Sequence, residues 1–449
     1  MQLTPIHSRT AGIHRHFRRS TRRIIPALLL SLALFAASCG QPSSETSSDA
    51  SGTLPSAVQR INREAAGIAD IMPRTADCAD TSAAGVFDTL ADNNAGDITP
   101  PNDSSENGRD PDFRVHGIYV TATVTGTERM KELIRLADET DINAFVIDIK
   151  DDRGNVTYQM AAPTVQAVGS SVTYISDIDA LIAECKAHDI YLIARIVSFK
   201  DPCLANAMPE YALHEADGTI FRDNSGQAWL NPYKREVWDY LMEIATQAAL
   251  AGFDEIQFDY IRFATDRGMD RVVFGEDSDE VSKSDIINAF TDYARETLAP
   301  LSVTVSADVY GTIIDSKWDQ QIVGQDYAAM ASSLDVICPM VYPSHYGPGV
   351  YRVPVPDADP YRTVTGALNA SRTVLDQYGH DTFCSVLQDG MPLTVRVRPW
   401  LQAFTATWVS GHIEYGREEI QAQIRAVQDA GYDEWIFWNA SVKYDPEWF

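Results

Sequence analysis

Three aspartates inside apolar, strand-like segments are the residues of this chain best suited to chemistry. Asp148 lies in "AFVIDIK", Asp259 in "EIQFDYIRF" and Asp308 in "LSVTVSADVY". A carboxylate among apolar neighbours costs free energy unless it is paired or hydrogen-bonded. Two carboxyl groups held close together can act as a general acid and as a nucleophile or charge-stabilising group. The aspartates can do so only if the fold brings them together.

The alternation of side chains along a strand predicts which of them face one another. Successive residues point to opposite faces, and the face that packs under helices is apolar. The odd-numbered residues of 144–150 are large and apolar, so Asp148 points the other way. The polar-side residues predicted from this and three further strands are Lys150, Arg195, Gln257, Asp259, Thr304, Ser306 and Asp308, with Arg396, Arg398, Trp400 and Gln402 from a later one.

Strands and amphipathic helices alternate from residue 113 to residue 449. Apolar residues recur at helical spacing in 127–140, 177–189 and 235–250. Eight strand–helix units favour a closed (β/α)8 barrel, the TIM barrel, over an open doubly wound sheet. The predicted strands are 115–121, 144–150, 190–197, 255–263, 301–310, 335–342, 395–402 and 434–441.

Barrel active sites lie at the carboxyl ends of the strands, where the inward polar residues are found. For the strands 335–342 and 434–441, the alternation does not decide which side chains face the barrel interior. The ends of these two strands nevertheless supply Tyr342, Trp438 and Asn439 to the same mouth.

The first 112 residues are predicted to lie outside the barrel. Residues 1–38 join a basic segment to an apolar run too short to cross a bilayer, which is typical of a signal peptide. "LFAASCG" resembles a bacterial lipobox and predicts an exported lipoprotein held at the membrane through Cys39. An ordinary secretory signal is the alternative. Residues 39–112 are interpreted as the lipidated cysteine, a flexible tether and a short N-terminal segment.

The chain is strongly acidic. Its 449 residues carry a formal charge of −27, and loss of residues 1–38 with their six arginines would bring it to −33. Such a surface repels nucleic acid and anionic headgroups, so no nucleic-acid partner is predicted and membrane attachment must come from the lipid. The sequence does not indicate an oligomeric state.

Neither a cofactor nor a metal site is predicted. No GxGxxG or GxxxxGK sequence follows an early strand, and the cysteines and histidines lack CxxC, HxH or HExxH spacing. Five cysteines accompany Cys39, and an odd number leaves at least one thiol free. Cys338, inside the apolar run "DVICPMVY", is the one expected to be free.

Nine motifs between residues 117 and 441 carry a family resemblance. They are "GIYVT", "FVIDIKDDRGNVTY", "LIARIVSFKD", "WLNPYKREVWDY", "GFDEIQFDYIRFATD", "SADVYG", "CPMVYPSHYGPG", "RPWLQAF" and "WIFWNAS". In this order they resemble the bacterial "putative glycosyl hydrolase domain" family, a domain of unknown function related to the glycoside-hydrolase-like TIM barrels. Ala264 stands where many members have proline. The resemblance implies a TIM barrel acting on carbohydrate and supplies no catalytic pair.

Glycoside hydrolysis commonly requires two carboxyl groups, one charged and one protonated. Asp259 is the expected nucleophile or charge-stabilising group, Asp308 the expected general acid, and Asp148 the reserve for either role. Arg262 or Arg195 is expected to hold Asp259 ionised. The residues expected to contact sugar are Lys150, Arg195, Arg262, Tyr342, Trp400, Gln402, Trp438 and Asn439.

Structural alternatives stand beside these roles. Asp148 and Lys150 could form an ion pair at the mouth, and Arg195 could simply neutralise a buried carboxylate. Asp308 could cap a loop, and the tryptophans could be core residues. The second functional interpretation is a non-catalytic carbohydrate-binding or cell-envelope lipoprotein on the same scaffold.

Overall fold

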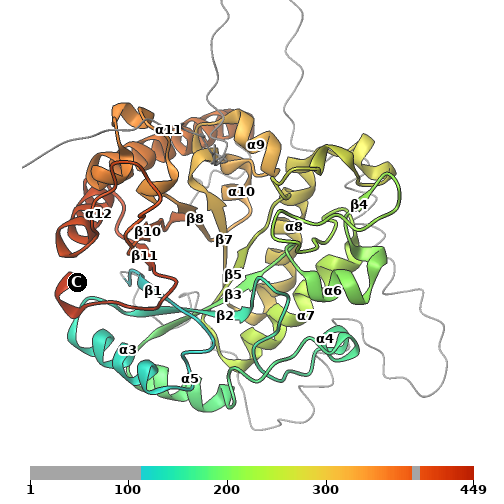
Figure 1. Ribbon diagram of the computed structural model, residues 1–449, viewed down its shortest axis with the longest axis horizontal. Helices are drawn as coiled ribbons and strands as arrows, with labels where there is room; N and C mark the ends of the chain where they lie inside the picture. The colour runs from blue at the N-terminus through green and yellow to red at the C-terminus, as the bar shows by residue number, and fades with distance from the viewer. Residues whose placement is uncertain (1–112, 387–394) are drawn as a thin grey trace, which may run out of the picture. The chain divides into compact units, whose positions relative to one another are not determined.

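Parallel strands form a closed barrel surrounded by helices (Figure 1). The computed structural model describes residues 113–386 and 395–449. The barrel strands are β1 (His116–Val120), β2 (Ala144–Lys150), β3 (Tyr191–Val197), β5 (Glu255–Asp259), β7 (Thr304–Tyr310), β8 (Val336–Met340), β9 (Arg396–Val397), β10 (Trp400–Gln402) and β11 (Trp435–Trp438). Consecutive strands pair from β1 to β9, β10 pairs with β11, and β11 pairs with β1. β9 and β10 do not pair with each other, and the pairing of β10 with β8 closes the ring. The predicted (β/α)8 fold is confirmed, whereas the predicted signal peptide, Cys39 and tether lie outside the described residues.

Helices follow the strands as the sequence predicts. They are α3 (Glu128–Glu139), α4 (Pro163–Val168), α5 (Ile178–Ala187), α6 (Pro202–Ala207), α7 (Arg235–Ala251), α8 (Lys283–Leu298), α9 (Lys317–Val323), α10 (Tyr327–Ser332), α11 (Pro360–Val386) and α12 (Arg417–Asp429). The predicted helices 127–140, 177–189 and 235–250 correspond to α3, α5 and α7. Gly252 ends α7 at a φ of 111°, a left-handed conformation that glycine adopts without strain, and leads the chain into β5.

The side chains of the strands divide between two separate cores. The core between barrel and helices contains Phe145, Ile147, Ile149, Leu192, Ala194, Ile196, Ile256, Phe258, Val305 and Ala307. The core inside the barrel contains Tyr119, Val146, Ile193, Cys338, Tyr342 and Trp400. The predicted alternation is therefore confirmed for the strands that carry the three aspartates.

Among the strand boundaries that differ from the prediction, three have a clear local reason. The predicted strand 255–263 ends at Asp259, because Tyr260 takes a φ of 50° and turns the chain out of the sheet. The predicted strand 301–310 starts at Thr304, since Ser302 is left-handed at 54°. The predicted strand 395–402 is split into β9 and β10 around Pro399, which has no N–H to donate to a neighbouring strand.

A two-stranded sheet lies beside the barrel and was not predicted. Residues 198–234, expected to form a loop that walls the substrate site, contain α6 and the strand β4 (His214–Glu215). β4 pairs antiparallel with β6 (Val272–Val273), which belongs to the loop after β5. Figure 1 shows β4 at the edge of the molecule, beyond α6 and α8.

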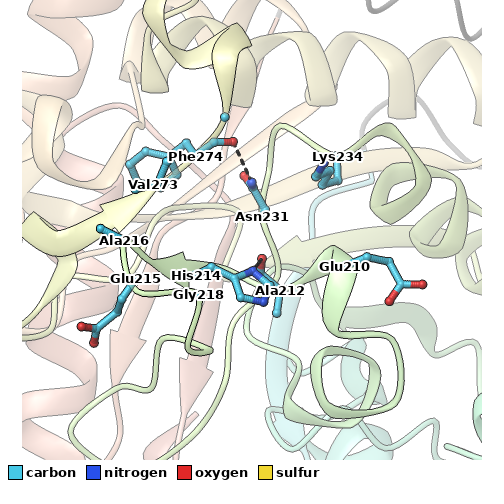
Figure 2. A pocket seen from close by; sticks show the side chains of 11 residues that line it. Glu210, Ala212, His214, Glu215, Ala216, Gly218, Asn231, Lys234, Val273 and Phe274 are labelled. Carbon is cyan, nitrogen blue, oxygen red and sulfur yellow. Dashed lines mark hydrogen bonds between the residues drawn. The ribbon is translucent and has the colours of Figure 1, made fainter.

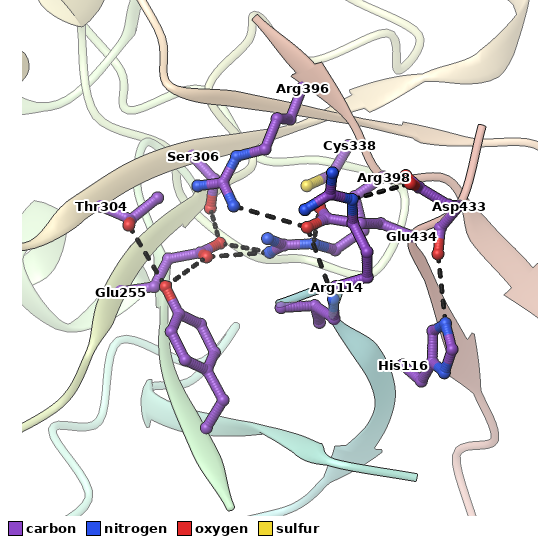
Figure 3. A network of polar contacts seen from close by, with 12 residues as sticks. Arg114, His116, Glu255, Thr304, Ser306, Cys338, Arg396, Arg398, Asp433 and Glu434 are labelled. Atoms are coloured by element: carbon purple, nitrogen blue, oxygen red, sulfur yellow. Dashed lines mark hydrogen bonds and ion pairs between the residues drawn. The ribbon is translucent and has the colours of Figure 1, made fainter. Parts of the chain in front are cut away.

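A buried ion network ties the first residues of several strands together inside the barrel (Figure 3). Arg398 donates from Nη1 to Glu255 at 2.7 and 2.9 Å and from Nε to Glu434 at 2.9 Å. Glu255 also accepts from the hydroxyls of Ser306 at 2.5 Å and Tyr191 at 3.1 Å. Because Arg398 and Glu255 are fully buried, each charge depends on the other for compensation.

Three cysteines of the described chain carry free thiols: Cys185, Cys203 and Cys338. The expectation that Cys338 is free is thus confirmed. Within residues 113–386 and 395–449, no helix combines the length and apolar character of a membrane span. The same residues hold no cluster of three or more His, Cys, Asp or Glu side chains arranged to bind a metal ion.

Candidate active site

The carboxyl ends of four adjacent strands, β2, β3, β5 and β7, carry a polar cluster. Across β2 and β3, Asp148 is in register with Arg195. Across β5 and β7, Phe258 is in register with Ala307, so Asp259 and Asp308 follow side by side at the next position. The structure therefore brings together the three predicted aspartates and one predicted arginine.

Arg195 connects the three carboxyl groups. Its Nη1 donates to Asp148 Oδ1 at 2.5 Å, and its Nε donates to Asp259 Oδ2 at 3.0 Å, an oxygen that Nη2 also contacts. The same Nε lies 3.9 Å from Asp308 Oδ2. Since the same nitrogen lies 3.0 Å from one Oδ2 and 3.9 Å from the other, the Oδ2 atoms of Asp259 and Asp308 are at most 6.9 Å apart.

Asp259 and Asp308 differ in their surroundings. Asp259 accepts hydrogen bonds at both oxygens, from Arg195 at Oδ2 and from the Tyr260 N–H at Oδ1, 2.6 Å away. Both oxygens of Asp259 thus act as acceptors. Asp308 is 1% exposed, and only its Oδ1 is bonded, by the indole N–H of Trp400 at 2.6 Å. Its Oδ2 has no hydrogen-bond partner among the described residues.

The protonation of Asp308 follows from these surroundings. Burial, and next the charge of Asp259, raise its pKa well above the ordinary value of 3.8, although Arg195 pulls in the opposite direction. Two carboxyl groups held this close do not readily both carry a negative charge, so one stays protonated. A protonated Asp308 can act as an acid beside a charged Asp259.

Asp148 has an intermediate environment. The hydroxyl of Tyr119 donates to its Oδ2, and Arg195 bonds its Oδ1. Burial raises the pKa of Asp148 above 3.8, with Arg195 and the Tyr119 hydrogen bond opposing that shift. Asp148 thus shares the guanidinium with Asp259 and can hold a proton more readily than an exposed aspartate.

Replacing Asp308 by asparagine should stabilise the protein at neutral pH. Because the pKa of Asp308 is raised in the folded state, the folded protein holds a proton that the unfolded chain has lost, so stability falls as the pH rises above 3.8. We expect Asp308→Asn to raise the unfolding free energy by about 1 kcal/mol at pH 7. Urea unfolding at pH 4 and pH 7 measures this, and a gain that failed to grow with pH would contradict it.

Aromatic side chains occupy the other half of the mouth, on β1, β10 and β11 and just after β8. The ring centroids of Tyr342 and Trp438 are 5.9 Å apart, and Tyr119 lies 6.4 Å from Trp438 and 6.4 Å from Trp400. Burial and the charges of Asp308 and Asp259 raise the pKa of Tyr342 well above 10.0, so it is a neutral hydroxyl group near both. Trp400 is buried and holds Asp308 through its N–H, which leaves Trp438 as the more accessible of the two predicted tryptophans.

Two predicted sugar-binding cations do not join the cluster. Lys150 is fully buried, where its Nζ contacts Asp201 Oδ2 at 3.0 Å and the Val197 carbonyl at 2.6 Å. Arg262 lies against the rings of Trp229, Tyr260 and Tyr310. The left-handed Tyr260 ends the strand alternation, which turns Arg262 away and leaves Arg195 as the arginine that bonds Asp259.

Two predicted amides are engaged by the protein itself. The Gln402 side chain accepts from the Ser344 N–H at 3.0 Å and donates to Asp357 at 2.9 Å and to Phe404 O at 3.0 Å. Asn439 donates to Ala403 O at 2.6 Å and to Lys443 O at 3.1 Å. Both side chains fasten the loops around the mouth, so either would have to break these bonds to bind a sugar.

One member of the cluster, Tyr119, was missed by the sequence analysis. It lies between two residues of the outer core, Ile118 and Val120, and itself faces the barrel interior. The alternation in "GIYVT", with apolar Ile118 and Val120 on either side of Tyr119, is the same pattern that located Asp148.

A pocket of about 360 Å³ lies away from the carboxyl cluster, at the small sheet of β4 and β6 (Figure 2). Its polar lining includes Glu210, His214, Asn231 and Lys234. Asn231 is tied to the Phe274 carbonyl at 2.9 Å, as Figure 2 shows. None of the predicted site residues lines this pocket.

The fold and the cluster define a TIM-barrel protein with three carboxyl groups around one arginine at the carboxyl ends of its strands. Residues 117–444 match the family described as "Putative glycosyl hydrolase domain", and the chain belongs to that family. The family that the motifs resemble is thereby confirmed. Among curated proteins, no match was found.

Two of the solved structures that are similar to this chain illustrate the likeness. The glycoside hydrolase domain of PgaB (BpsB) from Bordetella bronchiseptica is 13% identical, covering 73% of this chain and 95% of that one with a TM-score of 0.51, which shows the shared fold. A hypothetical protein from Ruminiclostridium thermocellum is 41% identical and covers 43% of this chain and 97% of that one, with a TM-score of 0.40.

Proposed function

We propose that this protein is a glycoside hydrolase that cleaves a cell-wall or environmental polysaccharide or oligosaccharide with two carboxyl groups. The observation that carries the proposal is the contrast between Asp259, bonded as a carboxylate, and Asp308, whose pKa is raised, beside one arginine. Membership of the glycosyl hydrolase domain family supports the same reaction.

In the proposed reaction, Asp308 gives its proton to the glycosidic oxygen as the bond from that oxygen to the anomeric carbon breaks. The bonding electrons leave with the oxygen, and Asp259 attacks the anomeric carbon or stabilises its positive charge. Water then attacks the anomeric carbon, and where a bond to Asp259 has formed, that bond breaks and its electrons return to the carboxylate. One proton of the water goes to Asp308, and the remaining hydroxyl group stays on the sugar. Arg195 orients Asp259 throughout.

The carboxyl separation bears on the stereochemistry. An upper limit of 6.9 Å between oxygens includes the roughly 5–5.5 Å of retaining enzymes and only the lower edge of the roughly 6.5–9.5 Å of inverting ones. We therefore favour retention, with Asp259 as the nucleophile. The anomer first released, observed by NMR, distinguishes the two outcomes.

The experiment that tests hydrolysis is the release of reducing sugar by the purified protein from a panel of cell-wall and dietary polysaccharides. We expect release from at least one polymer, with activity falling at high pH as the general acid loses its proton. Because burial raises the pKa of Asp308, that fall should occur well above pH 3.8. No release from any polymer would refute the proposal.

The same pH profile separates Asp308 from its reserve, Asp148. The variant that lacks the general acid should lose the decline at high pH, whereas a variant that lacks only a positioning group should keep it. We expect the decline to disappear in Asp308→Asn and to persist in Asp148→Asn. The reverse result would assign the acid role to Asp148.

A second interpretation is a carbohydrate-binding protein without turnover. The observation that favours it is the engagement of Arg195 by Asp148 and Asp259, a pairing that satisfies the charges without a substrate. This interpretation expects Asp259→Asn to bind sugar as the wild type does, with no hydrolysis by either.

The proposal extends to the location of the protein. We infer export, with Cys39 carrying a lipid and residues 40–112 linking the membrane to the barrel. The barrel then acts outside the cytoplasm, where cell-wall and environmental polysaccharides are found.

A further inference from the structure

An exposed tryptophan continues the aromatic half of the mouth outward. Trp408 is 67% exposed, on the loop between β10 and α12. Its ring stacks on Phe404 with centroids 5.9 Å apart and planes 19° from parallel. Phe404 in turn meets Trp438 edge to face at 5.2 Å. Trp438 lies beside Tyr119, whose hydroxyl bonds Asp148.

These contacts form one connected series, which we name the ring series: Tyr119, Trp438, Phe404 and Trp408. Its inner end touches the carboxyl cluster and its outer end reaches solvent. Two ring contacts, with centroid spacings of 5.2 and 5.9 Å, connect Trp438 to Trp408 through Phe404. The buried rings of the series contribute to core packing. Trp408 is exposed, so core packing does not explain its place in the series.

The loop holds Trp408 in place. The N–H of Val409 donates to the Ala406 carbonyl at 2.9 Å, which makes a turn that contains Trp408. The Tyr415 N–H bonds the Thr405 hydroxyl at 3.0 Å and closes the base of the same loop. A large apolar ring kept at the surface loses the free energy of burial, which contact with a ligand restores.

We propose that Trp408 is the outer platform of a binding track for a linear saccharide chain, which leads along the ring series to the carboxyl cluster. Sugar rings present flat faces of C–H groups that pack on aromatic rings. The proposed saccharide is neutral rather than anionic, because a protein with a net charge of −27 repels a polyanion. The inference rests on the proposed function for its inner end, but binding at Trp408 does not require turnover.

Affinity electrophoresis tests the track independently of hydrolysis. The probes are four soluble neutral polysaccharides, namely mixed-linkage β-glucan, xylan, galactomannan and hydroxyethyl cellulose, with polygalacturonate as the anionic comparison. We expect at least one neutral polymer to retard the wild type, and Trp408→Ala to weaken that binding about five- to tenfold, as loss of one aromatic contact does. The matched control is Trp318→Ala, which removes another exposed tryptophan, 71% accessible on α9 and outside the ring series.

The outcomes separate the two proposals. Retardation that Trp408→Ala weakens and Trp318→Ala preserves supports the track, even if no sugar is released and the hydrolase proposal fails. The track is overturned if no neutral polymer retards the wild type, if polygalacturonate retards it instead, or if both tryptophan variants bind equally well. Where hydrolysis occurs, the loss of kcat/KM in Trp408→Ala should grow with the length of the oligosaccharide.

Discussion

Asp259→Asn is expected to lower kcat/KM for glycoside hydrolysis by about a thousandfold or more, the scale that removal of a reacting group produces. The asparagine keeps the size of the side chain, but its single carbonyl oxygen can accept at only one of the two positions that Arg195 and the Tyr260 N–H contact. It cannot attack the anomeric carbon or balance its developing charge. Initial rates on whichever polysaccharide the wild type cleaves provide the measurement.

The matched control for this variant is Asp433→Asn. Asp433 lies before β11, at the opposite end of the barrel, where it is exposed and pairs with Arg114 at 2.7 Å. We expect its rates to equal those of the wild type. If Asp259→Asn also retained the wild-type rate within a factor of three, Asp259 would have no catalytic role.

Removing Arg398 should produce the largest loss of stability. Arg398→Met leaves Glu255 and Glu434 buried without their cation, a change that costs about 3–5 kcal/mol when one partner of a buried pair is removed. Urea unfolding followed by tryptophan fluorescence measures the loss. If the variant is insoluble, Arg398→Lys provides the measurement, because it keeps the charge and loses the two-pronged contact, and it should fall between methionine and the wild type.

A neighbouring arginine supplies the control. Arg396 contacts Glu434 at 3.4 Å, but its side chain is 34% exposed, so Arg396→Met should cost about 1 kcal/mol or less. Adding Glu255→Gln and Glu434→Gln to Arg398→Met should recover much of the lost stability by removing the unpaired charges. Equal effects of the two arginine substitutions would contradict the importance of burial.

The barrel and its aspartates could be predicted because both depend on local alternation. Apolar residues at every second position identify the outer face of β2, β5 and β7, and thereby turn Asp148, Asp259 and Asp308 inward. Alternation holds only as long as the strand continues. At Tyr260 the backbone turns, so of the two arginines predicted to hold Asp259, Arg262 points elsewhere and Arg195 makes the contact.

Contacts that involve loops were less predictable, because they join residues far apart in the sequence. Gln402 bonds Asp357, and Asn439 bonds Ala403, contacts that no periodic pattern indicates. Trp408 is similar: it lies in a loop, and only its ring contact with Phe404 relates it to the mouth. The sequence thus predicted the four charged residues that the strands bring together, but not Trp408, which a loop places beside the mouth.

The interruption at Pro399 gives the barrel a seam. β8 shares two register pairs with β9 and one with β10, whereas β2 and β3 share six. Fewer cross-strand bonds mean that amide hydrogens there should exchange with solvent sooner than those of β2 and β3. Tyr342 follows β8, and Trp438 ends β11, next to β10. The aromatic half of the mouth can therefore move more easily than the half that holds Arg195.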